Sequence, residues 1–412
     1  MLPGRIILRA QRPAASGQPD AMSHRIIKSF DGHLTDLLGG FLLWRLLLYL
    51  GAYVAGAVGG RNPAFSGPDP LQSLRSLLFD SWVHWDAGWY LGIIQHGYAY
   101  QGPGAAANVA FFPLYPMSLR MVLKMLGQLN NRQLAVSLGI VWSNVCLLLA
   151  VLLLYRLTKF ELEQLGQQDS DRQALWAAVY LMLFPTSIFF ASLYPEALFV
   201  CLLIASFYCL RTGKFLLGGL LGAAASLCRI NGLVLLLPFA IEYYRRWGFH
   251  LRKELLALTL IPIGTLLYCA FLYLAFNEPL AFLRVQSAPG WHGTISGWPY
   301  SRTVGNILFW LHQRDNVWIF LEMLYAGLIL FLAIVSLKKL PLAYGACAIA
   351  ACVVPLASDT WSIQRYVLAA FPAFMMLGWL SRKPRLNFLF AAFCVFMLGV
   401  NTVMWINGMW LG

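Results

Sequence analysis

Long apolar runs alternate with short polar segments along most of this chain. A helix that crosses a bilayer needs about 20 largely apolar residues. The first run that meets this requirement is 37–58, where Arg45 is the only charged residue. Further candidate spans follow at 133–154, 174–193, 195–210, 215–228, 230–241, 255–276, 317–337, 340–357, 366–380 and 386–406. The pattern predicts an all-α, polytopic membrane protein with about 11 transmembrane helices, within a range of roughly 10–13.

Two regions fit this pattern less simply. Residues 111–127 contain Arg120 and Lys124, which favours an interfacial or re-entrant segment over a span. The runs 215–228 and 230–241 are each short for a full span. Joining them into one helix would place Arg229 at its centre and four basic residues on the outer side, so two short limbs are favoured.

The remaining segments divide the chain into a tail, one domain and two outer loops. Residues 1–33 form a polar N-terminal tail, and 34–412 form a single transmembrane domain. Residues 60–110 contain Gly, Pro, Trp and Tyr but no uninterrupted span, which predicts a long first outer loop with interfacial helices. Residues 277–315 form a second outer loop.

The composition agrees with membrane integration. The chain is 59% hydrophobic and only 11% charged, whereas soluble domains carry about 25% charged residues. This balance excludes a cytosolic enzyme, a disordered chain and a nucleic-acid binder. The eight cysteines all lie inside apolar runs and none forms a CxxC pair, so we interpret them as small buried apolar residues.

The net charge of +13 follows from 30 Lys and Arg against 17 Asp and Glu. Basic residues concentrate in cytoplasmic loops of membrane proteins, so this excess implies no nucleic-acid partner. The tail is basic and lacks a cleavable-signal pattern, which predicts that it stays cytoplasmic, with Met22 as an alternative start. Four inner turns carry the basic clusters Arg211 and Lys214; Arg245, Arg246, Arg252 and Lys253; Lys338 and Lys339; and Arg382, Lys383 and Arg385.

Ionisable residues near the outer ends of spans are the candidates for chemistry, because polar groups at membrane depth are costly and usually face a cavity. Asp86 lies in the segment His84-Trp85-Asp86-Ala87-Gly88-Trp89-Tyr90, before a predicted helix from Ala87 to His96. A partly desolvated carboxylate there suits a general base. The alternative is a helix N-cap. For His84 and His96, interfacial hydrogen bonding is favoured over a catalytic role.

Three other outer segments contain suitable polar residues. Glu196, in Tyr194-Pro195-Glu196, either complements a helix N-terminus or contacts a ligand. Arg229 and Arg365 stand at outer turns, where their guanidinium groups suit phosphate binding. The alternative for each arginine is snorkelling to the interface. Together with Asp86, these residues predict an outer cavity with one base and two phosphate-binding arginines.

In this order, the segments resemble the PIG-V family of mannosyltransferases, within the GT-C superfamily of polytopic glycosyltransferases. The resemblance covers residues 35–245, and later only Arg365-Tyr366 with Pro372. A departure is Pro195, which stands where the family usually has a small polar residue. The matching segments are His84–Ala87 with Tyr90, Gly97-Tyr98, Ala110–Pro116, Ser187–Phe190, Tyr194–Phe199 and Arg229–Gly232.

The resemblance implies an inverting transfer of a hexose, in the family mannose, from a polyprenyl- or dolichyl-phosphate donor. The acceptor would be a glycan or glycolipid on the non-cytosolic face, as in GPI-anchor biosynthesis. The acidic catalytic residue of the family's first outer loop falls on Asp86, which would act as the general base. Donor phosphate and substrate contacts would fall on Arg229, Arg365, Glu196 and Asn231, and supporting positions on His84, Trp85, Tyr90, Tyr115 and Tyr194.

No metal site has convincing spacing, and metal dependence stays open. The expected partners are membrane lipids, the isoprenoid-phosphate sugar donor and the acceptor. The chain has no Asn-x-Ser/Thr sequon, which favours a bacterial inner membrane, with the site facing the periplasm, over the endoplasmic reticulum. The second outer loop contains Trp291, His292, Trp298 and Tyr300, which suit either a sugar-stacking lid or an interfacial aromatic belt.

Two rival functions remain. The span count and the arginines at membrane depth also suit a transporter or flippase of a lipid-linked sugar. Such proteins often have two related halves, but the long loop after the first span has no counterpart later in this chain. An inactive relative that serves as a scaffold is the other rival, and the intact Asp86 argues against it.

Overall fold

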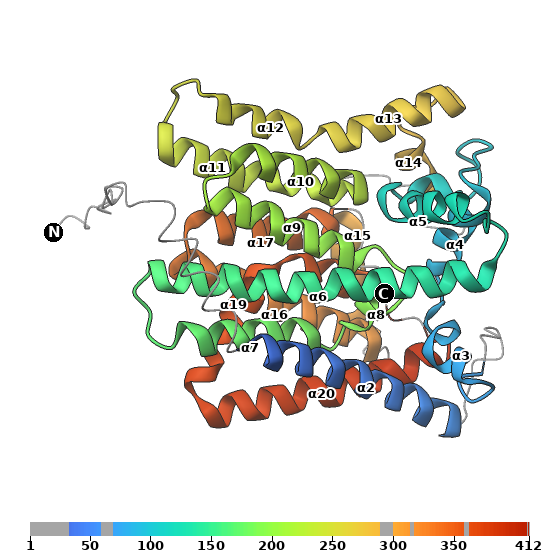
Figure 1. The fold of residues 1–412 in the computed structure, drawn as a ribbon, viewed down its shortest axis with the longest axis horizontal. Coiled ribbons are helices and arrows are strands. Elements are labelled where there is room, and N and C mark those ends of the chain that lie inside the picture. The colour runs from blue at the N-terminus through green and yellow to red at the C-terminus, as the bar shows by residue number, and fades with distance from the viewer. Residues whose placement is uncertain are drawn as a thin grey trace.

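The computed structural model describes residues 33–58, 69–288, 300–313, 317–357, 362–409 and 411. Within these ranges the regular elements are α-helices and 3-10 helices, and no strand occurs. The longer helices run along one axis of the molecule (Figure 1). The prediction of an all-α helical bundle is therefore confirmed.

The main helices of this bundle are α2 (Leu34–Val58), α6 (Arg132–Gln164), α7 (Ser170–Leu183), α9 (Glu196–Arg211), α10 (Phe215–Cys228), α11 (Leu236–Trp247), α13 (Ile263–Phe276), α16 (Val317–Lys339), α17 (Leu342–Leu356) and α20 (Pro384–Ile406). The other α-helices are α3 (Leu74–Leu78), α4 (Ala87–His96), α5 (Leu114–Met125), α8 (Ile188–Ala191), α12 (Leu256–Leu260), α14 (Ala281–Arg284), α15 (Ser301–Gln313), α18 (Ile363–Tyr366) and α19 (Phe371–Gly378). The 3-10 turns are η1 (Asp80–Trp82), η2 (Asn108–Ala110), η3 (Ile230–Leu235), η4 (Lys253–Leu255), η5 (Val285–Ser287), η6 (Val367–Ala369) and η7 (Trp379–Arg382).

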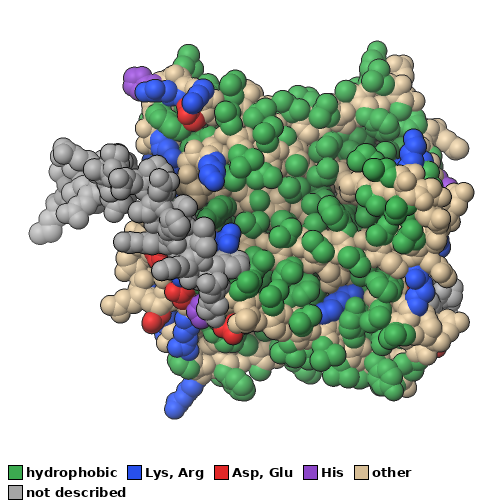
Figure 2. Space-filling model, viewed as in Figure 1, with side chains coloured by type: hydrophobic (Ala, Val, Ile, Leu, Met, Phe, Trp, Pro, Cys, Tyr) green, Lys and Arg blue, Asp and Glu red, His purple; other side chains and the backbone are tan. Residues whose placement is uncertain are grey.

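Several helices are long and apolar enough to cross a membrane. Among the described residues these are α2, α6, Phe320–Lys339 within α16, and α20. Two bent pairs also qualify, Lys253–Leu260 with Ile263–Phe276 at 43° and Ile363–Ala369 with Phe371–Arg382 at 73°. Hydrophobic side chains cover most of the middle of the visible face, and charged ones gather towards its two ends (Figure 2). The expected number of about 11 spans stays a prediction.

The two ends of the bundle differ in character. Helices α3, α4 and α5 lie together at the right of Figure 1, and we call this the α4 end. At the opposite end, which we call the basic end, Arg211 of α9 bridges two buried carboxylates. Its Nε lies 2.6 Å from Glu161 of α6, and a terminal nitrogen lies 2.9 Å from Glu242 of α11. Since both carboxylates are almost fully buried, this pairing offsets the cost of their desolvation and joins three helices.

Helix α5 explains why residues 111–127 carry charge. It has only 12 residues, about 18 Å of helix, which is too short to cross a bilayer. Its Arg120 donates to the backbone oxygens of Ile94 and Gln95 at 2.9 and 2.7 Å, the last carbonyls of α4. Met121 and Met125 of the same helix are exposed. These features agree with an interfacial helix that supports α4.

The segment 215–241 forms two limbs, as expected. Helix α10 ends at Cys228, and Arg229 is extended, with φ −155° and ψ 142°. The chain then returns through η3 into α11. A Cβ at Gly232 would lie 2.4 Å from the backbone nitrogen of Ser226, so only glycine permits this close return beside α10.

The candidate span 174–193 differs from a single helix. Helix α7 ends at Leu183, and Phe184 leaves the helical region with ψ 137°. The cause is Pro185, which disfavours helical backbone at the residue before it. The short α8 follows in a separate turn. All eight cysteines are free. The prediction that they are buried is confirmed for seven of them, whereas Cys269 is half-buried.

Candidate functional site

Asp86 is presented by a tightly held turn at the start of α4. Trp85 has a positive φ of 55°, a conformation that costs energy for a bulky residue and persists only where its surroundings fix it. The hydroxyl of Tyr194 fixes this turn, because it donates to the backbone oxygen of His84 and accepts from the backbone nitrogen of Asp86, both at 3.1 Å. The turn before α4 is thus fastened to the loop before α9.

The carboxylate of Asp86 does not cap α4. Asp86 occupies the N-cap position, but its side chain makes no capping hydrogen bond. Its Oδ2 accepts instead from a terminal nitrogen of Arg365 at 2.8 Å. The structure therefore rejects the helix-capping alternative and joins two residues that are 279 positions apart.

Arg365 lies between two carboxylates. Besides Asp86, its Nε approaches Oε1 of Glu196 at 3.3 Å, and its second terminal nitrogen donates to the hydroxyl of Ser362 at 3.2 Å. The side chain is only 6% exposed. A buried guanidinium with this many partners is rigidly oriented.

Arg229 completes the cluster from the break between α10 and η3. It donates to Oε1 of Glu196, the first residue of α9. The other carboxylate oxygen of Glu196, Oε2, is buried and has no hydrogen-bond partner among the described residues. Glu196 therefore does more than complement the N-terminus of α9, since it pairs with two arginines and keeps one acceptor atom unused.

The four side chains form a charge-balanced group that we call the ion cluster: Asp86, Glu196, Arg229 and Arg365. Two guanidinium groups face two carboxylates, as burial at this depth requires. The side chain of Asp86 is 18% exposed, against 4% for Glu196 and 6% for Arg365. Asp86 is thus the acidic member of the cluster that is more open to an incoming molecule.

Aromatic rings surround the two arginines. The guanidinium carbon of Arg229 lies 4.9 Å from the centre of the Tyr366 ring, and that of Arg365 lies 5.3 Å from the same ring. Arg365 also lies over Tyr194 at 5.4 Å and Phe189 at 5.8 Å. Each ring face attracts the cations and keeps water away from them. The sequence alone assigns no role to Tyr366 or Phe189, although Phe189 lies in the matching segment Ser187–Phe190 and Tyr366 follows Arg365.

Tyr90 and Tyr115 support the cluster without belonging to it. The ring of Tyr90 packs edge-on against Tyr115 at 5.8 Å and Phe111 at 4.9 Å. The hydroxyl of Tyr115 bonds to Ser143 at 3.0 Å and to the backbone oxygen of Gly139 at 3.1 Å, both in α6. Burial raises the pKa of Tyr90 far above its usual value, so this phenol stays neutral.

His84 is a buried structural residue. Its ring packs edge-on against Trp405 with a centroid separation of 5.7 Å, and its Nε2 has no partner among the described residues. Burial lowers the pKa of His84 to about 4, which makes the ring neutral at pH 7. No hydrogen bond or ion pair joins its ring to the described part of the ion cluster.

The other predicted positions lie outside the ion cluster. Asn231 is half-buried at the start of η3, Trp85 forms the turn before Asp86, and His96 ends α4 on the surface. Trp291, His292 and Trp298 of the second outer loop lie outside the described residues. Within the described ranges, no group of three or more His, Cys, Asp or Glu side chains could hold a metal ion.

A family model described as "Mannosyltransferase (PIG-V)" matches residues 59–407. Among curated proteins, the "GPI alpha-1,6-mannosyltransferase 2" of Rattus norvegicus is 34% identical over 178 residues, which cover 42% of this chain and 34% of that protein. The Homo sapiens protein of the same name is 34% identical over 157 residues, covering 37% of this chain and 29% of that protein. The aligned region thus spans about a third of the curated relatives.

Among solved structures, the chain is similar to the oligosaccharyltransferase of Archaeoglobus fulgidus, solved with zinc and sulfate. The TM-score is 0.42 at 15% identity, over 88% of this chain and 52% of that one. A likeness of this size gives no residue-by-residue correspondence.

Proposed function

This chain belongs to the mannosyltransferase (PIG-V) family, and on that premise we propose that it transfers a hexose, in the first place mannose, between lipid-borne substrates. The proposed donor is a polyprenyl- or dolichyl-phosphate sugar, and the proposed acceptor is a lipid-linked sugar or glycan. The reaction takes place at the α4 end of the bundle, on the non-cytosolic face of the membrane. In a bacterium that face is the periplasmic side of the inner membrane.

The observation that carries this proposal is the contact between Asp86 and Arg365 at 2.8 Å. This contact places a partly exposed carboxylate next to a buried guanidinium. A sugar transfer from a lipid phosphate uses both groups, the carboxylate as a base and the guanidinium to bind the phosphate. Asp86 accepts the proton of the acceptor hydroxyl while the oxygen of that hydroxyl attacks the anomeric carbon of the donor sugar. The bond to the phosphate breaks on the opposite side of that carbon, so the transfer inverts its configuration.

The arginines act on the departing phosphate. As the glycosidic bond breaks, negative charge grows on the lipid phosphate, and fixed guanidinium groups stabilise it without reorganisation. In the resting structure these groups are paired with Asp86 and Glu196. A donor phosphate would share Arg365 with Asp86 and so loosen that pair, which frees the carboxylate to accept a proton once the donor is in place.

Glu196 has a second role in this proposal. Its Oε1 holds both arginines, while the unpartnered Oε2 can accept a hydrogen bond from a sugar hydroxyl. A buried hydrogen-bond acceptor of this kind selects strongly between sugars, because a sugar without a hydroxyl at the matching position leaves the buried oxygen without a hydrogen bond. Glu196 therefore orients the sugar, whereas Asp86 takes part in the proton transfer.

The test is a transfer assay with purified protein, a radiolabelled polyprenyl-phosphate mannose and a lipid extract. The proposal predicts that label leaves the donor and appears in a new glycolipid. The rival transporter function predicts movement of intact donor across vesicles without cleavage. Donor that is neither cleaved nor moved would favour the inactive relative and contradict the proposal.

A further inference from the structure

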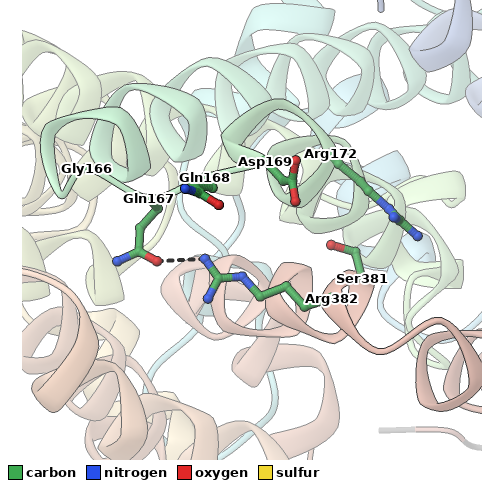
Figure 3. A pocket seen from close by; sticks show the side chains of 7 residues that line it. All are labelled: Gly166, Gln167, Gln168, Asp169, Arg172, Ser381 and Arg382. Atoms are coloured by element: carbon green, nitrogen blue, oxygen red, sulfur yellow. Dashed lines mark hydrogen bonds between the residues drawn. The ribbon is translucent and has the colours of Figure 1, made fainter.

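The basic end of the bundle carries a polar pocket far from the ion cluster. Its volume is about 510 Å³. One wall is the loop from Gly166 to Asp169 between α6 and α7, and the other is formed by Ser381 and Arg382 of η7 (Figure 3). Arg172, in the first turn of α7, completes the lining. Nothing in the proposed sugar transfer uses this pocket.

Its positive groups are available to a ligand. Arg172 and Arg382 are both exposed, and neither forms an ion pair with a carboxylate among the described residues. Arg382 donates to Oε1 of Gln167 at 2.6 Å and stacks on Trp379 at 5.4 Å. These contacts orient its guanidinium and leave most of its five N–H donors unused. In Figure 3 the two arginines lie on opposite sides of the hollow.

The start of α7 adds a second favourable feature. Asp169, at the N-cap position, is left-handed, with φ 57° and ψ 32°, and its side chain makes no capping bond. By contrast, Asn131 caps α6 through its Oδ1, which accepts from the backbone nitrogen of Leu134 at 3.0 Å. The free amides of α7, a helix of 14 residues, therefore keep their preference for an anion.

An independent observation also indicates a ligand. The hydroxyl of Ser381 lines the pocket, yet this residue is only 1% exposed and its oxygen has no hydrogen-bond partner among the described residues. In Figure 3 it points into the hollow between the two arginines. Buried hydroxyls are normally satisfied, and an oxygen of a bound anion would satisfy this one.

We propose that this pocket binds a phosphate group, and that the phosphate of an anionic lipid headgroup is its natural occupant. Two arginines outweigh the single carboxylate of Asp169, and phosphate oxygens match the paired donors of a guanidinium. Lys383 and Arg385 follow directly at the start of α20 and are exposed. They extend the positive charge along the surface of the basic end, where lipid headgroups would lie.

The experiment titrates the purified full-length protein in detergent by calorimetry with three probes. These are dioctanoyl phosphatidic acid, inorganic phosphate and dioctanoylglycerol, which has no phosphate. The proposal predicts saturable binding of phosphatidic acid and none of dioctanoylglycerol. Equal affinity for inorganic phosphate would support the site and assign the occupant to the soluble anion.

Variants separate the pocket from the general charge of this end. The double variant Arg172→Gln with Arg382→Gln should weaken binding at least about tenfold, and Ser381→Ala by about two- to tenfold. The matched control Lys383→Gln with Arg385→Gln removes the same charge outside the lining and should keep the affinity within about twofold. All four positions are remote from the ion cluster, so sugar transfer should continue in both double variants.

Two results would overturn the proposal. One is the absence of saturable binding for both phosphate probes. The other is an equal loss of affinity in the two double variants, which would show that any basic residue of this surface contributes equally.

Discussion

The two arginines of the ion cluster differ in their surroundings, and this difference is testable. Arg365 contacts both carboxylates of the cluster, whereas Arg229 pairs with Glu196 and lies over Tyr366. A lysine in either place keeps the charge but loses the planar fork that pairs with a phosphate or carboxylate.

We predict that Arg365→Lys and Arg229→Lys each raise the KM for the lipid-phosphate donor by about tenfold or more. Arg365→Lys should also lower kcat, because the lysine ammonium lacks the fixed, paired donors that stabilise the charge growing on the departing phosphate. The control is Arg284→Lys, an exposed arginine paired with Glu278 at the same end. Unchanged donor dependence in both cluster variants would indicate that these arginines only stabilise the fold.

His84 gives a prediction for pH. Burial lowers the pKa of His84 to about 4 in the folded protein, whereas its pKa in the unfolded chain is about 6.5. As the pH falls, His84 therefore becomes protonated in the unfolded chain before it does so in the folded protein. The free energy of unfolding should therefore fall as pH drops from about 6.5 to 4. His84→Phe keeps a ring against Trp405 and should flatten thermal stability across this window. His96→Gln, a change at the exposed end of α4, should leave the fall unchanged; an identical fall in the His84 variant would contradict the assignment.

At the scale of elements, the apolar pattern predicts most helices to within a few residues. The helix expected from Ala87 to His96 is α4, and the two limbs around Arg229 are α10 and η3 with α11. The end of α7 before Phe184 is not visible in the apolar pattern, because apolar residues continue on both sides of it. The periodicity of apolar residues therefore does not reveal that Pro185 ends the helix.

The site is predictable only in part, for a physical reason. The charged members are visible because a lone Asp, Glu or Arg in an apolar sequence is costly and needs an explanation. Their pairing is not visible, since it depends on how four distant elements pack. In the sequence nothing distinguishes Tyr366 and Phe189 from the many other aromatic residues. Only the fold shows that their rings lie against Arg365.

The chain returns so close to α10 at Gly232 that a side chain there can be used as a test. A methyl group there meets the backbone of Ala225 and Ser226 at 2.4–2.7 Å, so Gly232→Ala must separate α10 from η3 and displace Arg229. We expect a loss of stability of about 1–3 kcal/mol and a marked loss of donor binding. The matched control is Gly399→Ala, at a position in α20 with nothing within 4 Å. Equal stability of the two variants in a thermal unfolding assay would contradict the close packing of Gly232 against Ala225 and Ser226.

At the scale of the molecule, the arrangement places the ion cluster and the basic end on opposite sides of the apolar middle. The positive-inside rule then predicts that the α4 end faces away from the cytosol. Gln101→Cys at the α4 end and Lys253→Cys at the basic end are both exposed positions. On intact cells, a membrane-impermeant thiol reagent should label the first above the wild-type background and not the second. The reverse pattern would place the proposed reaction in the cytosol.

In the proposed sugar transfer, Asp86 removes the proton and the buried arginines support the reaction. The most direct test of this role is the initial rate of transfer from radiolabelled polyprenyl-phosphate mannose by purified Asp86→Asn beside the wild type. Both proteins are first matched for thermal unfolding and monodispersity, because breaking a buried ion pair also destabilises. If Asp86 is the base, Asp86→Asn should fold and transfer mannose at a rate at least about 100-fold lower. A folded variant that transfers mannose at the wild-type rate would contradict this role.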